Sequence, residues 1–175
     1  AWVEATGLSE TGRSILQALY QSQEHGLSPS RYHVEQIEKL SQVPTTSPEA
    51  RDQLNQMLLQ AVATYAQDLQ YGATSSTRYD RLNITPNKPP LEDTITNIKQ
   101  QAHVVEWLNS IAPHSLIYSQ LRQSMARYQG IKNQGGWPKY TAKTTIKPGE
   151  SSNNIKSLSE ILSSTGDYTG SVITN

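Results

Sequence analysis

The stretch that decides the fold is residues 47–72, SPEARDQLNQMLLQAVATYAQDLQYG. Its apolar side chains recur every three or four residues, which is the spacing of one face of an α-helix. They are Leu54, Met57, Leu58, Ala61, Val62, Tyr65, Ala66 and Leu69. Ser47 before Pro48 is typical of a helix start, and Gly72 is typical of a helix end. We therefore predict a long central helix of about 24 residues, roughly 36 Å in length.

The same periodicity predicts shorter helices on both sides of the long one. They begin near Glu10, Ser28, Leu91, Val104, Ser115 and Asn154. The first two are expected to end at His25 and Leu40, with Val34, Ile37 and Leu40 facing inward. The fifth carries an apolar stripe of Tyr118, Leu121, Met125 and Tyr128.

These patterns predict an all-α fold, namely an irregular multi-helix bundle around a long central helix, with a short C-terminal extension. The segment Gly135-Gly136-Trp137-Pro138 closes the helical region, because two glycines and a proline do not continue a helix. We expect a helical domain over residues 1–138. Residues 139–175 would form a linker and a single amphipathic helix, which has to dock on another part of the protein to bury its apolar face.

Composition excludes several classes of function. Lys and Arg together number 15, as do Asp and Glu, and the sequence has no basic stripe of the kind that nucleic-acid binding requires. No apolar run approaches the roughly 20 residues of a membrane-spanning helix. There is no cysteine, which excludes disulfides, thiolate metal sites and a cysteine nucleophile within this sequence.

Motifs that carry chemistry are also missing from the sequence. It contains no Gly-x-Ser-x-Gly elbow, phosphate-binding loop, dinucleotide fingerprint or His-Glu-x-x-His segment. The four histidines lack metal-ligand spacing, and the Glu92-Asp93 pair is explained by favourable charge at a helix start. We therefore assign no catalytic, cofactor-binding or metal-binding residue.

Three residues are candidates for contact with a ligand or partner. Trp137, between Gly-Gly and Pro, is either an anchor packed on the bundle or an exposed aromatic for a sugar or peptide, and burial is the more usual fate of a large aromatic. Arg78 and Tyr79 belong to a charged aromatic cluster in the long irregular stretch 73–90. That cluster either meets a ligand or ties the loop down.

Six segments, in order, resemble the scaffold region of YcbB-type L,D-transpeptidases. The first two are AWV at 1–3 with GLS at 7–9 and LQAL at 16–19, and EHGLSPSRYH at 24–33. The next two are YAQDLQYG at 65–72 and the segment from Ala112-Pro113-His114 to Arg127-Tyr128. The last two are GGWP at 135–138, and residues 146–149 together with 158–168.

This resemblance implies a non-catalytic scaffold fragment of an enzyme of the periplasm or cell envelope that cross-links peptidoglycan in cell-wall biogenesis. Residues 139–175 would then hold a linker and the first helix of a truncated peptidoglycan-binding-like module. The family's catalytic domain of the YkuD type carries a Ser-His-Gly-Cys motif, which this sequence lacks. The implied partners are peptidoglycan, through the parent protein, and the parent's own catalytic domain in cis. The parent would be an acyltransferase, whereas this chain alone has no cysteine nucleophile.

Two other functions are compatible with the sequence. One is a free-standing helical interaction module of the cell envelope, with an apolar groove near residues 73–90 or at the last helix. The other is a complete hydrolase or lyase with a carboxylate site, against which the missing catalytic constellation argues.

Overall fold

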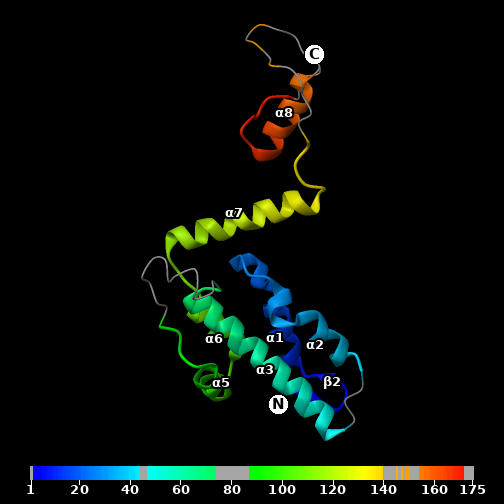
Figure 1. Ribbon diagram of the computed structural model, residues 1–175, viewed down its shortest axis with the longest axis vertical. Helices are drawn as coiled ribbons and strands as arrows, with labels where there is room; N and C mark the ends of the chain where they lie inside the picture. Colours follow the sequence, from blue (N-terminus) through cyan, green and yellow to red (C-terminus); the bar gives the residue numbers. More distant parts are fainter. Residues whose placement is uncertain are drawn as a thin grey trace. The chain divides into compact units, whose positions relative to one another are not determined.

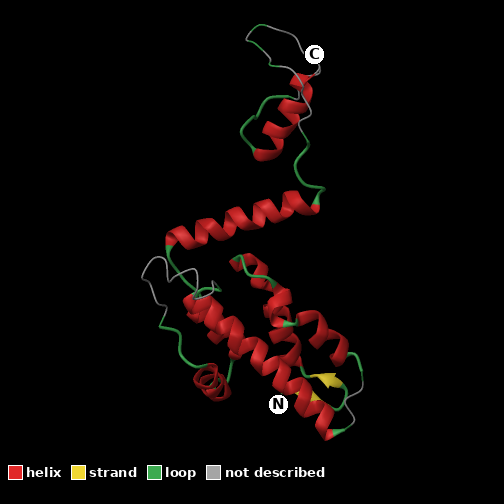
Figure 2. Cartoon of the chain, in the orientation of Figure 1, coloured by secondary structure: helices red, strands yellow, loops and turns green. Residues whose placement is uncertain are grey.

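The computed structural model describes residues 2–43, 47–73, 87–139, 145, 147, 149 and 154–171. Among them the fold is all-α apart from a two-stranded hairpin (Figure 2), which confirms the predicted fold class. The chain divides into two compact units, Ala1–Arg122 and Gln123–Asn175. The expected domain boundary at residue 138 stays a prediction.

The elements of the first unit are arranged around one long helix. In chain order they are β1 (Val3–Glu4), β2 (Gly7–Leu8), α1 (Glu10–Tyr20), the 3₁₀ turns η1 (Gln21–His25) and η2 (Pro29–Tyr32), α2 (Val34–Ser41), α3 (Pro48–Tyr71), α5 (Leu91–Gln100) and α6 (Val104–Ile111). The helix α7 (Leu116–Asn133) runs from the first unit into the second, which also contains α8 (Asn154–Thr165).

The central helix α3 forms where the sequence predicts it. The Ser47 hydroxyl accepts a hydrogen bond from the Ala50 N–H at 3.1 Å, and Pro48 occupies the first turn, where it costs no hydrogen bond. Gly72 ends the helix with a φ of 82°, a conformation that a glycine adopts easily. The predicted long central helix, with both of its ends, is therefore confirmed.

The core of the first unit lies along α3, which contacts α1, α2, η2, α5 and α6. Figure 1 shows α3 running diagonally through this unit, with α1 and α2 along one side and α5 along the other. Burial extends beyond the predicted apolar face, because eight of the nine residues from Ala61 to Leu69 are buried. They include two polar residues, Gln67 and Asp68.

Two of the predicted helices are interrupted. The first ends as an α-helix at Tyr20 and continues as the tighter turn η1, which Gly26 closes with a φ of 72°. The helix expected over residues 28–40 is wrong as a single element, because His33 takes a left-handed conformation with φ 53° and ψ 33°. This residue separates η2 from α2 and breaks the run of helical hydrogen bonds.

The interruption also changes which side chains face the core. Val34 and Ile37 are buried as expected, whereas Leu40, in the last turn of α2, is 37% exposed. The inward orientation predicted for Leu40 is therefore wrong.

The apolar stripe predicted on α7 is present in the sequence but is not buried. No residue of α7 is buried, and Leu121, Met125 and Tyr128 are 63%, 38% and 48% exposed. Helical spacing places these side chains on one face, but burial requires a facing surface that the spacing alone does not supply. The helix predicted from Asn154 is observed as α8, followed by Gly166 with a φ of 82°.

The N-terminal hairpin packs directly against the start of α1. The strands β1 and β2 pair antiparallel, and the Ser9 side chain caps α1 by accepting from the Gly12 N–H at 3.1 Å. Gly12 is buried, and a Cβ built on it would lie 2.2 Å from the Trp2 carbonyl oxygen. The close approach of these two backbones therefore requires glycine at position 12.

Gly12→Ala is expected to lower the free energy of unfolding by about 1–3 kcal/mol, because the added methyl group overlaps the Trp2 carbonyl. Gly130→Ala is the matched control, since Gly130 lies in α7 with open space around its Cβ. The control should leave the unfolding midpoint unchanged or raise it, because alanine favours a helix. Urea denaturation followed by circular dichroism at 222 nm measures both, and equal midpoints for the two variants would contradict this account of the hairpin.

Candidate functional site

The three residues predicted to contact a ligand are only partly placed by the structure. Arg78 and Tyr79 lie outside the described residues, as does most of the irregular stretch 73–90. Trp137 is 44% exposed, and its ring centroid lies 5.7 Å from that of Tyr128. The ring rests against Tyr128, which is itself half exposed, and packing of Trp137 against the helical bundle stays a prediction. A ligand contact at Trp137 stays a prediction.

A different set of residues is brought together on α3, around Asp68. The Asp68 side chain is completely buried, and its two oxygens accept four hydrogen bonds. Arg31 donates from Nε to Oδ2 at 2.5 Å and from Nη2 to Oδ1 at 3.3 Å. The Tyr32 hydroxyl donates to Oδ2 at 3.1 Å, and Lys88 Nζ donates to Oδ1 at 3.2 Å. We call these four residues the Asp68 cluster.

The Asp68 cluster joins three segments that are distant in the sequence. Arg31 and Tyr32 come from η2, Lys88 precedes α5, and Asp68 lies one turn from the end of α3. The neighbouring Gln67 reinforces the junction, since its amide nitrogen donates to the Pro89 carbonyl at 2.9 Å and to the Thr94 hydroxyl at 3.0 Å. The polar residues near the end of α3 thus hold both η2 and the start of α5 in place.

The charges in the Asp68 cluster are unequal. Two cations, Arg31 and Lys88, meet one carboxylate, which leaves one positive charge in excess. The hydrogen bond with Asp68 raises the pKa of the Arg31 guanidinium. Burial, with the nearby Asp68 charge, raises the pKa of the Tyr32 hydroxyl, which therefore remains a neutral donor. All the oxygens of Asp68 face protein donors, so this carboxylate is poorly suited to act as a general base on a ligand.

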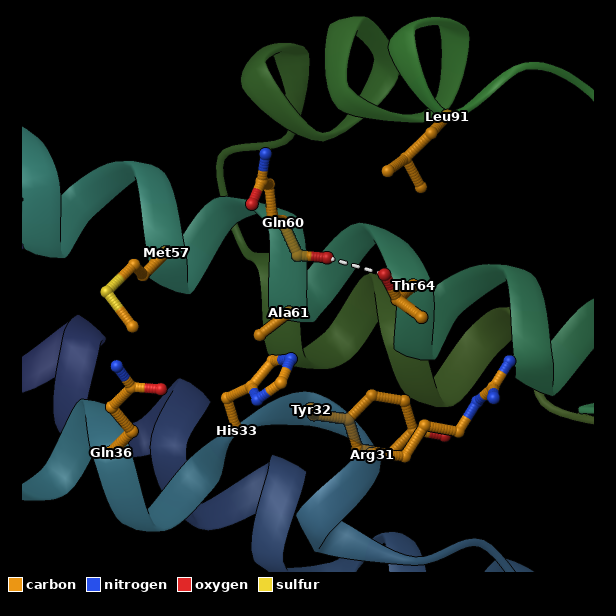
Figure 3. A pocket seen from close by; sticks show the side chains of 9 residues that line it. All are labelled: Arg31, Tyr32, His33, Gln36, Met57, Gln60, Ala61, Thr64 and Leu91. Carbon is orange, nitrogen blue, oxygen red and sulfur yellow. Dashed lines mark hydrogen bonds between the residues drawn. The ribbon is translucent and has the colours of Figure 1, made fainter.

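A cavity of about 420 Å³ adjoins this cluster. Figure 3 shows Arg31 at one end of the cavity and Met57 with Gln36 at the other, with His33 and Ala61 between them. The complete lining is Arg31, Tyr32, His33, Gln36, Met57, Gln60, Ala61, Thr64 and Leu91. Among the described residues, this lining combines apolar and amide side chains with one guanidinium and contains no acidic residue.

The left-handed residue His33 lies in the wall of this cavity. It is the one non-glycine residue with a positive φ in the part of the chain that the structure describes. A side chain at such a position costs conformational energy that glycine would avoid, and strain of this kind is concentrated at functional sites.

A second polar cluster ties the start of α7 to η1. His25 Nδ1 lies 2.7 Å from the Tyr118 hydroxyl, and Arg122 Nη2 donates to Glu24 Oε2 at 2.6 Å. Burial, and then the Arg122 charge, lowers the pKa of His25, while burial raises the pKa of the adjacent Tyr65 to about 12. This cluster connects two elements, and none of its residues lines the cavity next to Asp68.

The described residues contain no group of three or more side chains that could hold a metal ion, and no described helix is long and apolar enough to cross a membrane. The arrangement around Asp68 is a buried ion pair that joins η2, α3 and the segment before α5. The sequence does carry one signal for it, because Asp68 interrupts the apolar face of the central helix between Tyr65, Ala66 and Leu69. A charge in that position indicates a buried ion pair.

Asp68→Asn is expected to lower the free energy of unfolding by about 2–4 kcal/mol, because it leaves Arg31 and Lys88 without their carboxylate. Asp52→Asn, on an exposed position of the same helix, should change it by less than about 0.5 kcal/mol. Urea denaturation of both variants measures the two changes in the free energy of unfolding. If Asp68→Asn lowers this free energy as little as Asp52→Asn does, the Asp68 cluster does not stabilise the bundle.

Comparison with protein families gives one finding. Residues 1–125 match the family described as Scaffold domain, and this range contains the Asp68 cluster and the adjoining cavity. Comparisons with curated proteins and with solved structures gave no match. Because the family match covers well over half of the 175 residues, the chain belongs to the Scaffold domain family.

Proposed function

We propose that this chain is the non-catalytic scaffold part of an L,D-transpeptidase that acts in peptidoglycan cross-linking and cell-wall biogenesis. The observation that carries the proposal is the match of residues 1–125 to the Scaffold domain family. The ordered resemblance of the sequence to YcbB-type L,D-transpeptidases adds the enzyme class. The proposed location is the periplasm or cell envelope.

In this proposal the helical bundle holds the parent protein's other parts in position. The first unit is suited to such a role, because buried side chains from β1, α1, α2, α5 and α6 all join one core along α3. Acyl transfer would belong to a cysteine of the parent's catalytic domain, since this sequence has no cysteine. Peptidoglycan would be contacted through the parent protein, and no residue of this chain is assigned a catalytic step.

One observation favours a second candidate function, a free-standing helical interaction module. Leu116, Ile117 and Leu121 on α7 are 73%, 71% and 63% exposed. Adjacent large apolar side chains at such exposure are typical of surfaces that bind another protein. The same exposure is compatible with the scaffold role, in which another part of the parent would cover these residues.

The coding sequence beyond Asn175 separates these two functions. Under the scaffold proposal, it continues into a peptidoglycan-binding-like module and a segment with Ser-His-Gly-Cys. A stop codon directly after Asn175 would instead favour the interaction module.

The scaffold role itself is tested in the longer protein that the proposal implies. Asp68→Asn is expected to reduce the fraction of L,D-type cross-links, because a destabilised bundle no longer positions the catalytic domain. Asp52→Asn serves as the control. Chromatography of muropeptides from cells that lack other L,D-transpeptidases measures the cross-links, normalised to the total amount of the protein in those cells. An unchanged yield in the Asp68→Asn protein, or no cross-links from the unmodified protein, would contradict the proposal.

A further inference from the structure

We propose that the cavity between η2, α2 and α3 binds a short peptide through a free carboxylate. This inference concerns the cavity next to the Asp68 cluster, and it stands independently of the transpeptidase proposal.

The charge of the cavity favours an anion. Among the residues that the structure describes, Arg31 is the one Arg or Lys residue in the lining, and the lining includes neither Asp nor Glu. Behind the wall, the Asp68 carboxylate is shared between Arg31 and Lys88, so it does not neutralise both cations. The Arg31 side chain is 45% exposed and remains accessible to a ligand.

The orientation of Arg31 favours a carboxylate in particular. Asp68 engages the Nε and Nη2 edge of the guanidinium. The other edge carries the Nη1 N–H groups, which make no hydrogen bond to any residue that the structure describes. A guanidinium edge matches the two oxygens of a carboxylate. Because Asp68 already restricts the side chain, less conformational entropy is lost when the ligand binds.

The remaining lining suits a peptide. Met57, Ala61 and Leu91 supply apolar surface for small side chains. The amides of Gln36 and Gln60 carry both donors and acceptors, which is the complement of a peptide group. The volume of about 420 Å³ falls within the range of small-molecule pockets and fits a ligand of two or three small residues.

His33 provides the remaining observation. Its backbone is left-handed, with a φ of 53°, and its ring lies in the middle of the lining (Figure 3). Glycine would relieve the backbone strain but would remove the ring from the cavity. The retained side chain is explained by a contact of the imidazole with the bound peptide.

The test is a titration of the ¹⁵N-labelled 175-residue chain with N-acetyl-Ala-Ala, which has a free carboxylate, and with its C-terminal amide. Chemical-shift changes are expected at residues 31–36 and 57–64 with the acid, and the amide is expected to bind roughly tenfold more weakly or worse. Arg31→Gln should weaken binding of the acid to a similar degree. Gln56→Ala, an exposed position of α3 outside the cavity, should bind like the unmodified chain.

A second variant separates binding from stability, because Arg31→Gln also removes a partner of Asp68. His33→Gly is expected to unfold at the same or a higher urea concentration and yet to bind the acid more weakly. Three results would each overturn the proposal: no shift changes with millimolar acid, equal affinity for acid and amide, or His33→Gly binding that matches the unmodified chain.

Discussion

Burial of a carboxylate on the central helix is the constraint on which the first unit depends. The second half of α3 is buried almost all round, so Asp68 has no access to water. An uncompensated charge in that position would cost several kcal/mol. The neighbouring segments therefore have to supply its donors, and they do so from η2 and from Lys88, which precedes α5. One polar side chain thus determines where three separate segments meet.

The interrupted helices follow from the same constraint. A continuous helix over residues 28–40 would present one face to α3. The observed break at His33 lets η2 direct Arg31 and Tyr32 towards Asp68 while α2 turns Val34 and Ile37 into the core. The strained backbone at His33 therefore allows the buried Asp68 charge to be paired and the apolar core to be packed. The cavity next to Asp68 is lined by residues of η2, which pairs with the Asp68 charge, and of α2, which contributes to the apolar core.

The exposed apolar side chains of α7 bear on how a domain of this family could act. A scaffold has to present surfaces as well as bury a core. The well-packed part of the first unit ends where His25 and Glu24 meet Tyr118 and Arg122. On the same helix α7, Leu121 and Met125 are left partly in solvent. The helix α7 thus combines contacts that close the core of the first unit with an exposed apolar face.

By itself, the sequence determined the helix content, the central helix with both of its ends, and the breaks at Gly26 and Gly72. These depend on contacts within a few residues, such as the Ser47 cap and the spacing of Leu54, Leu58 and Val62, which a linear pattern records. Only the tertiary structure decided which apolar faces are buried, that His33 is left-handed, and that Arg31, Tyr32 and Lys88 surround Asp68. Those outcomes depend on side chains 20 to 37 residues apart, whose approach is set by packing and charge compensation.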